Sequence, residues 1–295
     1  MSEPDYVWRQ IEALVRGAEN EVTLVAPFVK KSVFEAVLAA VPESVRRVDC
    51  VTRWTPAEVA AGVSDPEICD VAEKDERVRI ALCSPWHAKL FRADDRCLVG
   101  SANLTGKATG LVAQPNIELL VDVPGDHGEV IRVLAEIEAV SVPATAQAAR
   151  LMRRQAELLA TTDRSEPRVA GAWCPITRRP ENVYPFYSGR SQFPAAVEDG
   201  LVEDLALLDI PAGLDEQQFK VVVQERLHAI PELRALVDGD RLGNIELRQA
   251  LAQRAGVSED QAVRMTDNIA EWLRFFASYY IGVGSWELRK GREVC

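Results

Sequence analysis

Helical and β-type hydrophobic patterns alternate along the first 125 residues of the chain. Residues 8–17 and 32–41 have the apolar spacing of amphipathic helices, and residues 65–74 begin as a helix often does, with an aspartate followed by a proline. Three short β-prone runs lie among these helices, at residues 21–27, 47–52 and 78–82. Alternation of this kind predicts an α/β sheet that contains parallel strands.

Three more β-prone pieces follow in close succession, at residues 86–91, 97–99 and 116–123. The pair Asp94-Asp95 between the first two suits a tight turn. The pattern then changes to long amphipathic helices over residues 129–140 and 144–160. We therefore expect the sheet to end shortly before these helices.

The second half of the chain is expected to begin with an ordered connector and to end in a helical domain. Prolines and aromatic residues are dense in the connector, and aromatic residues at this density need a surface to pack on. The candidate helices beyond it are residues 214–229, 230–237 and 244–255. The predicted domains are a catalytic sheet domain at 1–125, a helical extension at 126–162, the connector at 163–196 and a mainly helical domain at 197–295.

The helical domain contains a candidate helix-turn-helix. Gly256-Val257-Ser258 lies between the helix that ends near residue 255 and a helix that begins at Glu259, as in the short connection of that motif. Residues 279–288 are then expected to form a β-wing, which would make the domain winged-helix-like. The alternative is a plain helical packing or dimerisation module, because short patterns of this kind are common by chance.

Composition narrows the class of protein. Hydrophobic residues make up 47% and charged residues 27% of the 295 residues, which is typical of a globular protein. The net charge of −11 excludes a generally basic nucleic-acid coat protein but leaves room for a local cationic groove. The six cysteines are scattered singly, so we expect no structural zinc site. Because no signal-peptide order or membrane-length apolar run is present, we expect a cytoplasmic protein that does not enter a membrane.

Four polar side chains on neighbouring strands form the candidate chemical site. His87 and Lys89 are two residues apart on a predicted strand, so they point to one face. Ser101 and Asn103 have the same spacing at the end of the next strand. An imidazole, an ammonium, a hydroxyl and an amide suit a phosphodiester, whose oxygens carry the charge. Because this face lacks the acidic cluster that metal-dependent phosphoryl transfer needs, we expect no metal and no other cofactor.

These residues carry a resemblance to a known family. The pattern His87-x-Lys89-x4-Asp94, followed by Gly100-Ser101-x-Asn103, resembles the HKD signature of the phospholipase D superfamily, in its single-motif, nuclease-like branch. The resemblance covers about Val7 to Val123. It implies a phospholipase D-like mixed sheet flanked by helices, and we place the mainly helical domain after it.

The resemblance also implies roles for individual residues. His87 would attack phosphorus and form a phosphohistidine, while Lys89, Ser101 and Asn103 would hold the phosphate oxygens. Glu118 falls where the family places an acidic residue that bonds the far ring nitrogen of the histidine; the alternative is a solvated strand residue. Asp94 would tie down its loop, or would serve only as a turn former.

This chemistry needs two imidazoles, one to attack and one to protonate the leaving oxygen. The remaining histidines, His127 and His228, lack a lysine two residues later, so the chain holds one copy of the motif. Single-motif members of the family dimerise. The resemblance therefore predicts a homodimer in which His87 of each subunit enters one shared site.

Four cations outside the motif are candidate nucleic-acid contacts: Arg53, Lys107, Arg178 and Arg179. Arg53 ends a predicted strand and could reach a flanking phosphate, or could form a surface salt bridge; Lys107 is equally ambiguous. Residues 164–190 combine an excess of arginine with Trp173, Tyr184 and Tyr187, which could stack bases or could pack as a belt on the catalytic domain.

The preferred function is a metal-independent phosphodiesterase, a nuclease that acts on DNA rather than RNA. One alternative is a phospholipase D that hydrolyses phospholipid, although the sequence offers no clear apolar lip for acyl chains. The other is a catalytically idle dimeric protein that binds nucleic acid. Cleavage in excess EDTA separates these three possibilities.

Overall fold

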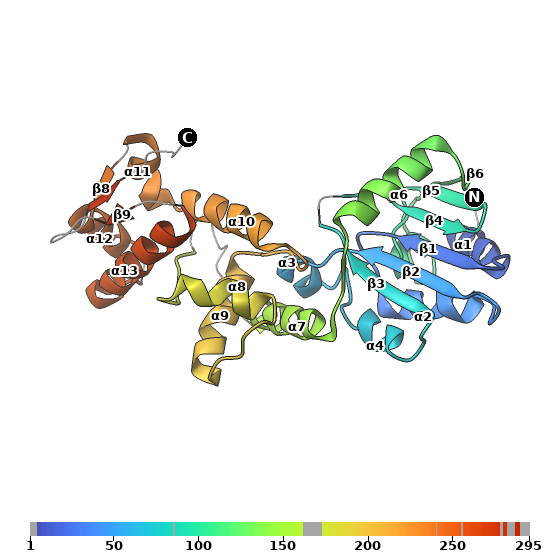
Figure 1. Cartoon of the computed structure of the whole chain (residues 1–295), viewed down its shortest axis with the longest axis horizontal. Helices are drawn as coiled ribbons and strands as arrows, with labels where there is room; N and C mark the ends of the chain where they lie inside the picture. Colours follow the sequence, from blue (N-terminus) through green and yellow to red (C-terminus); the bar gives the residue numbers. More distant parts are fainter. Residues whose placement is uncertain are drawn as a thin grey trace. The chain divides into compact units, whose positions relative to one another are not determined.

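The computed structural model describes residues 5–84, 86–161, 173–239, 241–254, 256–277, 280–281 and 287–289. The chain divides into two compact units, shown in Figure 1. The first contains residues 1–156 and the short segment 211–213, and the second contains residues 157–210 and 214–295. The first unit thus extends past the expected domain end at residue 125, because the helices that follow pack against its sheet.

A mixed sheet forms the centre of the first unit. In the described residues it has seven strands in the order β6-β5-β4-β1-β2-β3-β7. The strands are β1 (Glu21–Val25), β2 (Arg47–Thr52), β3 (Val78–Leu82), β4 (Leu90–Ala93), β5 (Arg96–Gly100), β6 (Leu120–Pro124) and β7 (Val142–Pro143). Strands β1, β2 and β3 are parallel, whereas β4, β5, β6 and β7 pair antiparallel with their neighbours.

Helices cover both faces of this sheet. They are α1 (Tyr6–Arg16), α2 (Lys31–Ala40), α3 (Pro56–Ala60), α4 (Ile68–Ala72), α5 (Gly106–Thr109), α6 (Gly128–Val140) and α7 (Ala146–Thr161). On one face Ile11 of α1 and Phe34 of α2 pack with Leu24 of β1 in the main core. On the other face α6 buries Ile137 against Val25 and its neighbours. The predicted fold class, a mixed sheet flanked by helices, is confirmed.

Two strands start later than their sequence pattern predicts. Strand β4 begins at Leu90 rather than at residue 86, because its last partner on β1 is Val25 and Pro27 beyond it has no N–H to donate. Strand β6 begins at Leu120 rather than at residue 116, because β5 ends at Gly100, opposite Leu120. His87 and Lys89 therefore precede a strand and do not lie within one.

The second unit is mainly helical, as predicted. Its helices are the 3-10 turns η1 (Pro180–Asn182) and η2 (Pro231–Leu233) and the α-helices α8 (Val183–Tyr187), α9 (Ala195–Leu207), α10 (Glu216–His228), α11 (Arg234–Gly239), α12 (Asn244–Ala252) and α13 (Glu259–Phe276). A small antiparallel sheet joins β8 (Arg241–Gly243), β10 (Glu287–Arg289) and β9 (Tyr280–Ile281).

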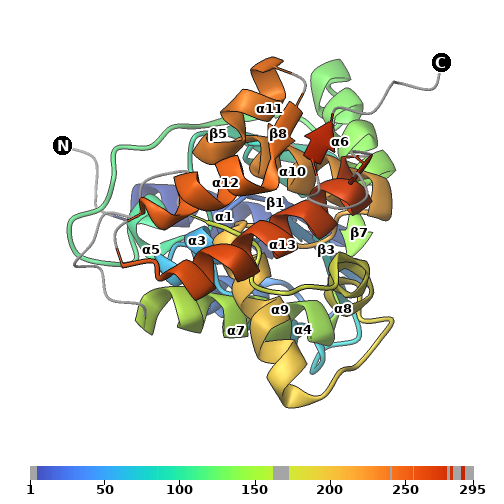
Figure 2. The ribbon, with the colours of Figure 1, turned by 90° about the vertical axis from the view of Figure 1, so that its left-hand side faces the viewer.

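The end of this unit has the order of a winged helix. Strand β8 leads into α12 and α13, which contact each other (Figure 2), and the chain returns through β9 and β10. Gly256 in the connection between the helices adopts φ +77°, a left-handed conformation that suits glycine. The expected wing spans β9 and β10, and the segment between them lies outside the described residues.

The first described residues of the connector are anchored by one buried carboxylate. Asp204 of α9 is fully buried and accepts hydrogen bonds from Trp173 Nε1 (3.2 Å), the Ile176 backbone N–H (2.8 Å) and the Thr177 backbone N–H (2.9 Å). Burial raises the pKa of Asp204 to about 6, although these hydrogen bonds lower it. The segment is therefore ordered, as its aromatic content predicts; residues 163–172 of the expected connector lie outside the described part.

Candidate active site

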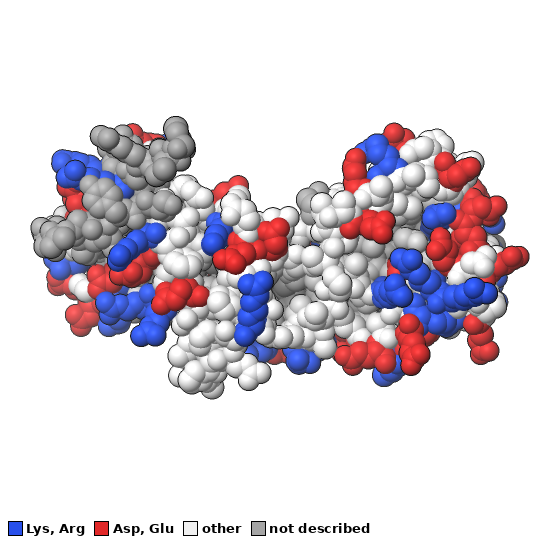
Figure 3. Space-filling view, viewed as in Figure 1, with Lys and Arg blue, Asp and Glu red and all other residues white. Residues whose placement is uncertain are grey.

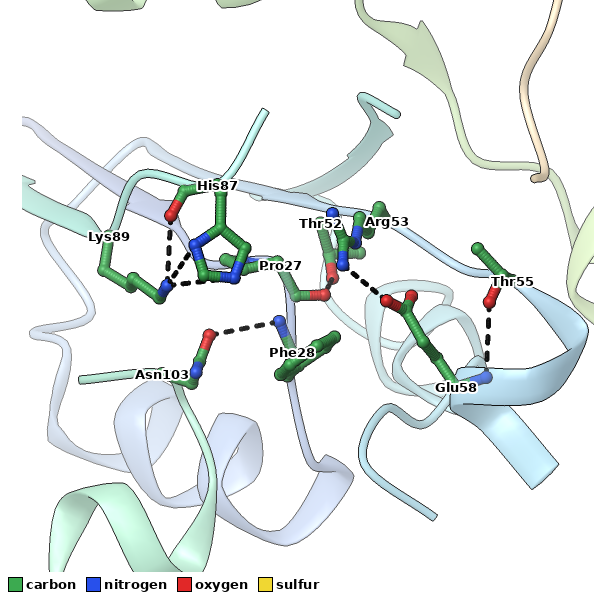
Figure 4. A network of polar contacts seen from close by, with 9 residues as sticks. All are labelled: Pro27, Phe28, Thr52, Arg53, Thr55, Glu58, His87, Lys89 and Asn103. Atoms are coloured by element: carbon green, nitrogen blue, oxygen red, sulfur yellow. Dashed lines mark hydrogen bonds and ion pairs between the residues drawn. The ribbon is translucent and has the colours of Figure 1, made fainter. Parts of the chain in front are cut away.

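His87 and Lys89 meet although they lie on no strand. The Lys89 ammonium lies 2.9 Å from His87 Nδ1 and 3.4 Å from Nε2, and it donates to the His87 carbonyl at 3.0 Å (Figure 4). Lys89 is buried, whereas His87 is exposed. The adjacent ammonium lowers the pKa of His87, with smaller contributions from burial and from Arg53, while Glu58 opposes them. The imidazole is therefore neutral near pH 7 and exposed to a substrate.

Asn103 is fixed beside this pair by the backbone. Its Oδ1 accepts the Phe28 N–H at 3.4 Å, and Figure 4 shows the amide next to the Lys89 ammonium. Leu104, the next residue, pairs with Val29 and accepts the Lys30 N–H at 2.9 Å, so the two loops are joined. Within the described residues, no hydrogen bond engages the Asn103 Nδ2 group, which leaves two donors for a ligand.

Ser101 is bound to Glu118. The Ser101 hydroxyl donates to the Glu118 carboxylate and accepts the Leu119 N–H at 3.0 Å, while the Ser101 N–H donates to the Leu119 carbonyl at 2.9 Å. Asn116 Nδ2 donates to the other Glu118 oxygen at 3.1 Å. The expected bond between Glu118 and the ring of His87 is absent from the contacts of the described residues, because both carboxylate oxygens face Ser101 and Asn116.

Gly100 allows the end of β5 to lie close to the segment that carries Glu118. A Cβ atom at residue 100 would lie 1.8 Å from the Leu119 carbonyl oxygen, far inside contact distance. Only glycine therefore lets β5 end against the segment that carries Glu118. This gives a physical reason for the first residue of the Gly100-Ser101-x-Asn103 pattern.

Asp94 fixes the loop that leads from α1 into β1. Its carboxylate accepts the backbone N–H groups of Glu19 (2.7 Å), Asn20 (3.1 Å) and Glu21 (3.0 Å), and its own φ is +50°. Burial raises the pKa of Asp94, but these backbone hydrogen bonds outweigh it and lower the pKa overall. Asp94 thus joins the β4–β5 turn to the loop that enters β1, and Asp95 completes the turn.

Arg53 lies beside His87 and forms a salt bridge, which is the second of the two roles that the sequence allowed for it. Its guanidinium pairs with Glu58 at 2.5 Å and lies over the Phe28 ring, 5.4 Å from the centroid (Figure 4). Its Nε and the second Glu58 oxygen are buried without hydrogen-bond partners in the described structure. Sequence reasoning missed Phe28 and Glu58. The pattern Thr55-Pro56-x-Glu58 directly after a strand signals the helix cap that places Glu58, and Thr55 Oγ1 accepts the Glu58 N–H at 3.2 Å.

The remaining candidate contacts are exposed side chains on other elements. Lys107 is exposed on α5 and its carbonyl accepts the Asn116 N–H at 2.9 Å. Arg178 and Arg179 are exposed in the second unit. The first unit therefore brings together His87, Lys89, Asn103 and Arg53, with the Ser101 and Glu118 pair close enough for the Glu118 charge to affect Lys89.

Trp173, Tyr184 and Tyr187, the candidates for base stacking in the connector, are buried or packed against other aromatic rings. Trp173 packs edge-on against Trp272, with 5.4 Å between ring centroids, and Tyr187 packs against Phe219 at 4.8 Å. Tyr184 is buried. Helix α13 carries four carboxylates and two guanidiniums, a poor match for a phosphate backbone. Packing therefore accounts for Trp173, Tyr184 and Tyr187, and α13 offers few cations to a phosphate backbone.

Throughout the described ranges, no three His, Cys, Asp or Glu side chains gather as they would to hold a metal ion. No helix among the described residues has both the length and the apolar character needed to cross a membrane. The five cysteines in the described part are free and buried, consistent with small core residues.

No family model and no curated protein matches the chain. Its fold is similar to that of NucT from Helicobacter pylori (14% identity, 48% of this chain and 93% of NucT, TM-score 0.36). It is also similar to Nuc from Salmonella typhimurium (17% identity, 47% of this chain and 91% of Nuc, TM-score 0.36). A third match is TrmBL2, an archaeal chromatin protein (15% identity, 47% of this chain and 50% of TrmBL2, TM-score 0.31).

Nuc is described as a phospholipase D family member.

Proposed function

We propose that the protein is a phospholipase D-like phosphodiesterase that cleaves nucleic acid, DNA in preference to RNA, without a metal. The observation that supports this most is the His87 and Lys89 pair. An ammonium 2.9 Å away lowers the pKa of an exposed imidazole, and the Asn103 amide, held through its Oδ1 by the Phe28 N–H, offers its Nδ2 donors beside this pair. A nucleophile and donors for phosphate oxygens thus share one small surface.

In the proposed reaction a ring nitrogen of His87 attacks phosphorus. A P–N bond forms, the P–O bond to the leaving nucleoside breaks, and the leaving oxygen takes a proton from a second imidazole that is in its protonated, imidazolium form. Water then attacks the phosphohistidine, gives a proton back to that imidazole and releases the phosphate end. Lys89 and Asn103 hold the non-bridging oxygens, whose charge grows in the transition state, and the Ser101 hydroxyl joins them once its proton turns from Glu118 to the phosphate.

The second imidazole is proposed to be His87 of a second copy. Apolar side chains flank Glu118 beside the site: Ile117 is fully exposed and Leu119 is 63% exposed, with Leu111 and Val112 exposed in the same loop. Large apolar side chains gathered on a surface are typical of an interface. A homodimer that buries this loop would bring two copies of the site together.

Arg53 and Lys107 are the proposed contacts for flanking phosphates in this unit. The Arg53 side chain is 23% exposed and pairs with Glu58 through Nη2, so its other terminal nitrogen can donate to a phosphate oxygen while the pair with Glu58 is kept. Lys107 is exposed on α5, beyond Asn103 along the chain. These contacts would add affinity that falls with salt.

The test is incubation with DNA, RNA and phosphatidylcholine in excess EDTA, together with a molecular-mass measurement. We expect DNA cleavage, a dimer mass and loss of cleavage in His87→Asn. His127→Asn is the matched control, because His127 caps α6 and asparagine keeps that cap. Release of choline instead would support a phospholipase, and tight DNA binding without turnover would support an idle binding protein. Full activity of His87→Asn would overturn the catalytic assignment.

A further inference from the structure

The second unit contains a pocket that the proposed reaction does not use. Its volume is about 530 Å³, and it lies between the residues around η1 and the first turns of α9. This volume is in the range of small-molecule sites, which is roughly 300–1,000 Å³. All of its lining residues belong to the second unit.

One side of the pocket offers donors for an anion. Arg178, Arg179 and Asn182 line it, and none of these side chains makes an ion pair or hydrogen bond with another described residue. Acidic residues outnumber basic ones in this chain by 45 to 34, and several exposed arginines of the described part have a carboxylate partner. Two adjacent guanidiniums without partners are therefore available to a ligand with at least one negative group.

The other side of the pocket is apolar. Phe193 and Val197 line it, together with Ile176, which is 42% exposed. The start of α9 bears no charged side chain before Glu198, and Figure 3 shows an uncharged surface at that end of the helix. The Glu198 carboxylate lies in the first turn of α9 and accepts the Phe193 N–H at 3.4 Å, so its negative charge offsets the positive end of the helix dipole. The arginines must therefore supply the contacts to an anion.

We propose that this pocket binds a nucleotide, with the phosphate on Arg178 and Arg179 and the base against Phe193. The choice of a nucleotide rests on the proposed nuclease function, because a ligand with an anionic end and a flat apolar end is what that substrate or its product supplies. The nucleotide is either free or the phosphorylated end of a strand, and both present the same chemistry to the pocket.

The experiment measures binding by calorimetry in EDTA, using full-length His87→Asn so that no substrate is consumed. The probes are deoxyadenosine monophosphate, deoxyadenosine, inorganic phosphate and a 5′-phosphorylated oligonucleotide. Loss of both arginines in Arg178→Ala/Arg179→Ala should weaken monophosphate binding by about tenfold or more. The control variant Arg234→Ala/Arg248→Ala removes the same charge from the same unit and should leave monophosphate binding unchanged.

Phe193→Ala separates a nucleotide site from a plain anion site. It should weaken the monophosphate and leave inorganic phosphate unchanged. Binding of the free monophosphate assigns the pocket to free nucleotide, and binding of the oligonucleotide alone assigns it to a strand end. Equal binding by the two double variants for every probe overturns the pocket. Cleavage by the parent chain is scored separately, so a protein that cleaves DNA but fails this test loses only the pocket.

Discussion

Replacing Asp94 by alanine should loosen the loop that joins α1 to β1. The Asp94 carboxylate accepts three backbone N–H groups, from Glu19, Asn20 and Glu21, at 2.7 to 3.1 Å. Hydrogen bonds to charged groups contribute about 1.5–3 kcal/mol each when sheltered, but these lie near the surface, so we assign about 2 kcal/mol to all three. Alanine at φ +50° costs about 1 kcal/mol more.

Hydrogen exchange at residues 19–21 measures this loss directly. About 3 kcal/mol corresponds to about a 100-fold faster exchange of these amides. Asp95→Ala is the matched control, because Asp95 is the exposed neighbour in the same turn, and a peptide from α13 serves as an internal reference. Asp94→Asn keeps the left-handed conformation and one acceptor, so it should have an intermediate effect.

The effect of Asp94 depends on pH in a defined direction. Because the pKa of Asp94 is lowered in the folded protein, its stabilisation is complete above the unfolded pKa of about 3.9 and is lost as pH falls through the folded value. Asp94→Asn and the parent chain should therefore differ at pH 7 and converge in acid. Equal exchange of residues 19–21 in Asp94→Ala and Asp95→Ala would refute the reasoning.

Three further predictions concern other parts of the chain. Gly100→Ala should abolish cleavage while the second unit stays folded by circular dichroism, because the added Cβ meets a backbone carbonyl 1.8 Å away. The neighbouring ammonium, burial and Arg53 lower the pKa of His87, in that order, whereas Glu58 raises it. Arg53→Gln should therefore move the acid limb of the pH–rate profile to higher pH, and Glu58→Gln should move it to lower pH. Burial raises the pKa of Asp204 to about 6. The free energy of unfolding of the second unit, measured in urea, should therefore fall by up to about 3 kcal/mol as pH rises from about 4 to 6. Asp204→Asn should remove this pH dependence.

The elements set by local pattern were predictable. Strands β1, β2 and β3 follow short apolar runs, and α10, α12 and α13 follow helical spacing, so each lies within a few residues of its expected range. The turn at Asp94 and its anchoring role also follow from local chemistry, since a short carboxylate tolerates φ > 0 and accepts nearby amides. The winged-helix order depends on the same kind of signal.

Features set by distant partners were not predictable. The start of β4 depends on Pro27, more than 60 residues earlier, which cannot continue the pairing. Glu118 bonds Ser101 and not the imidazole, because the close approach at Gly100 brings the two strand ends together. The Arg53 and Glu58 pair joins a strand end to the first turn of α3, and only the folded chain shows that it lies beside His87.

Trapping a covalent phosphohistidine tests the central claim most directly. The parent chain is mixed with DNA in EDTA, quenched in alkali, which preserves a P–N bond, and digested for mass spectrometry. We predict that the peptide containing His87 carries the phosphate end of the cleaved strand, and that His127→Asn shows the same adduct. DNA cleavage without this adduct, or an adduct on any other residue, would contradict the proposed mechanism.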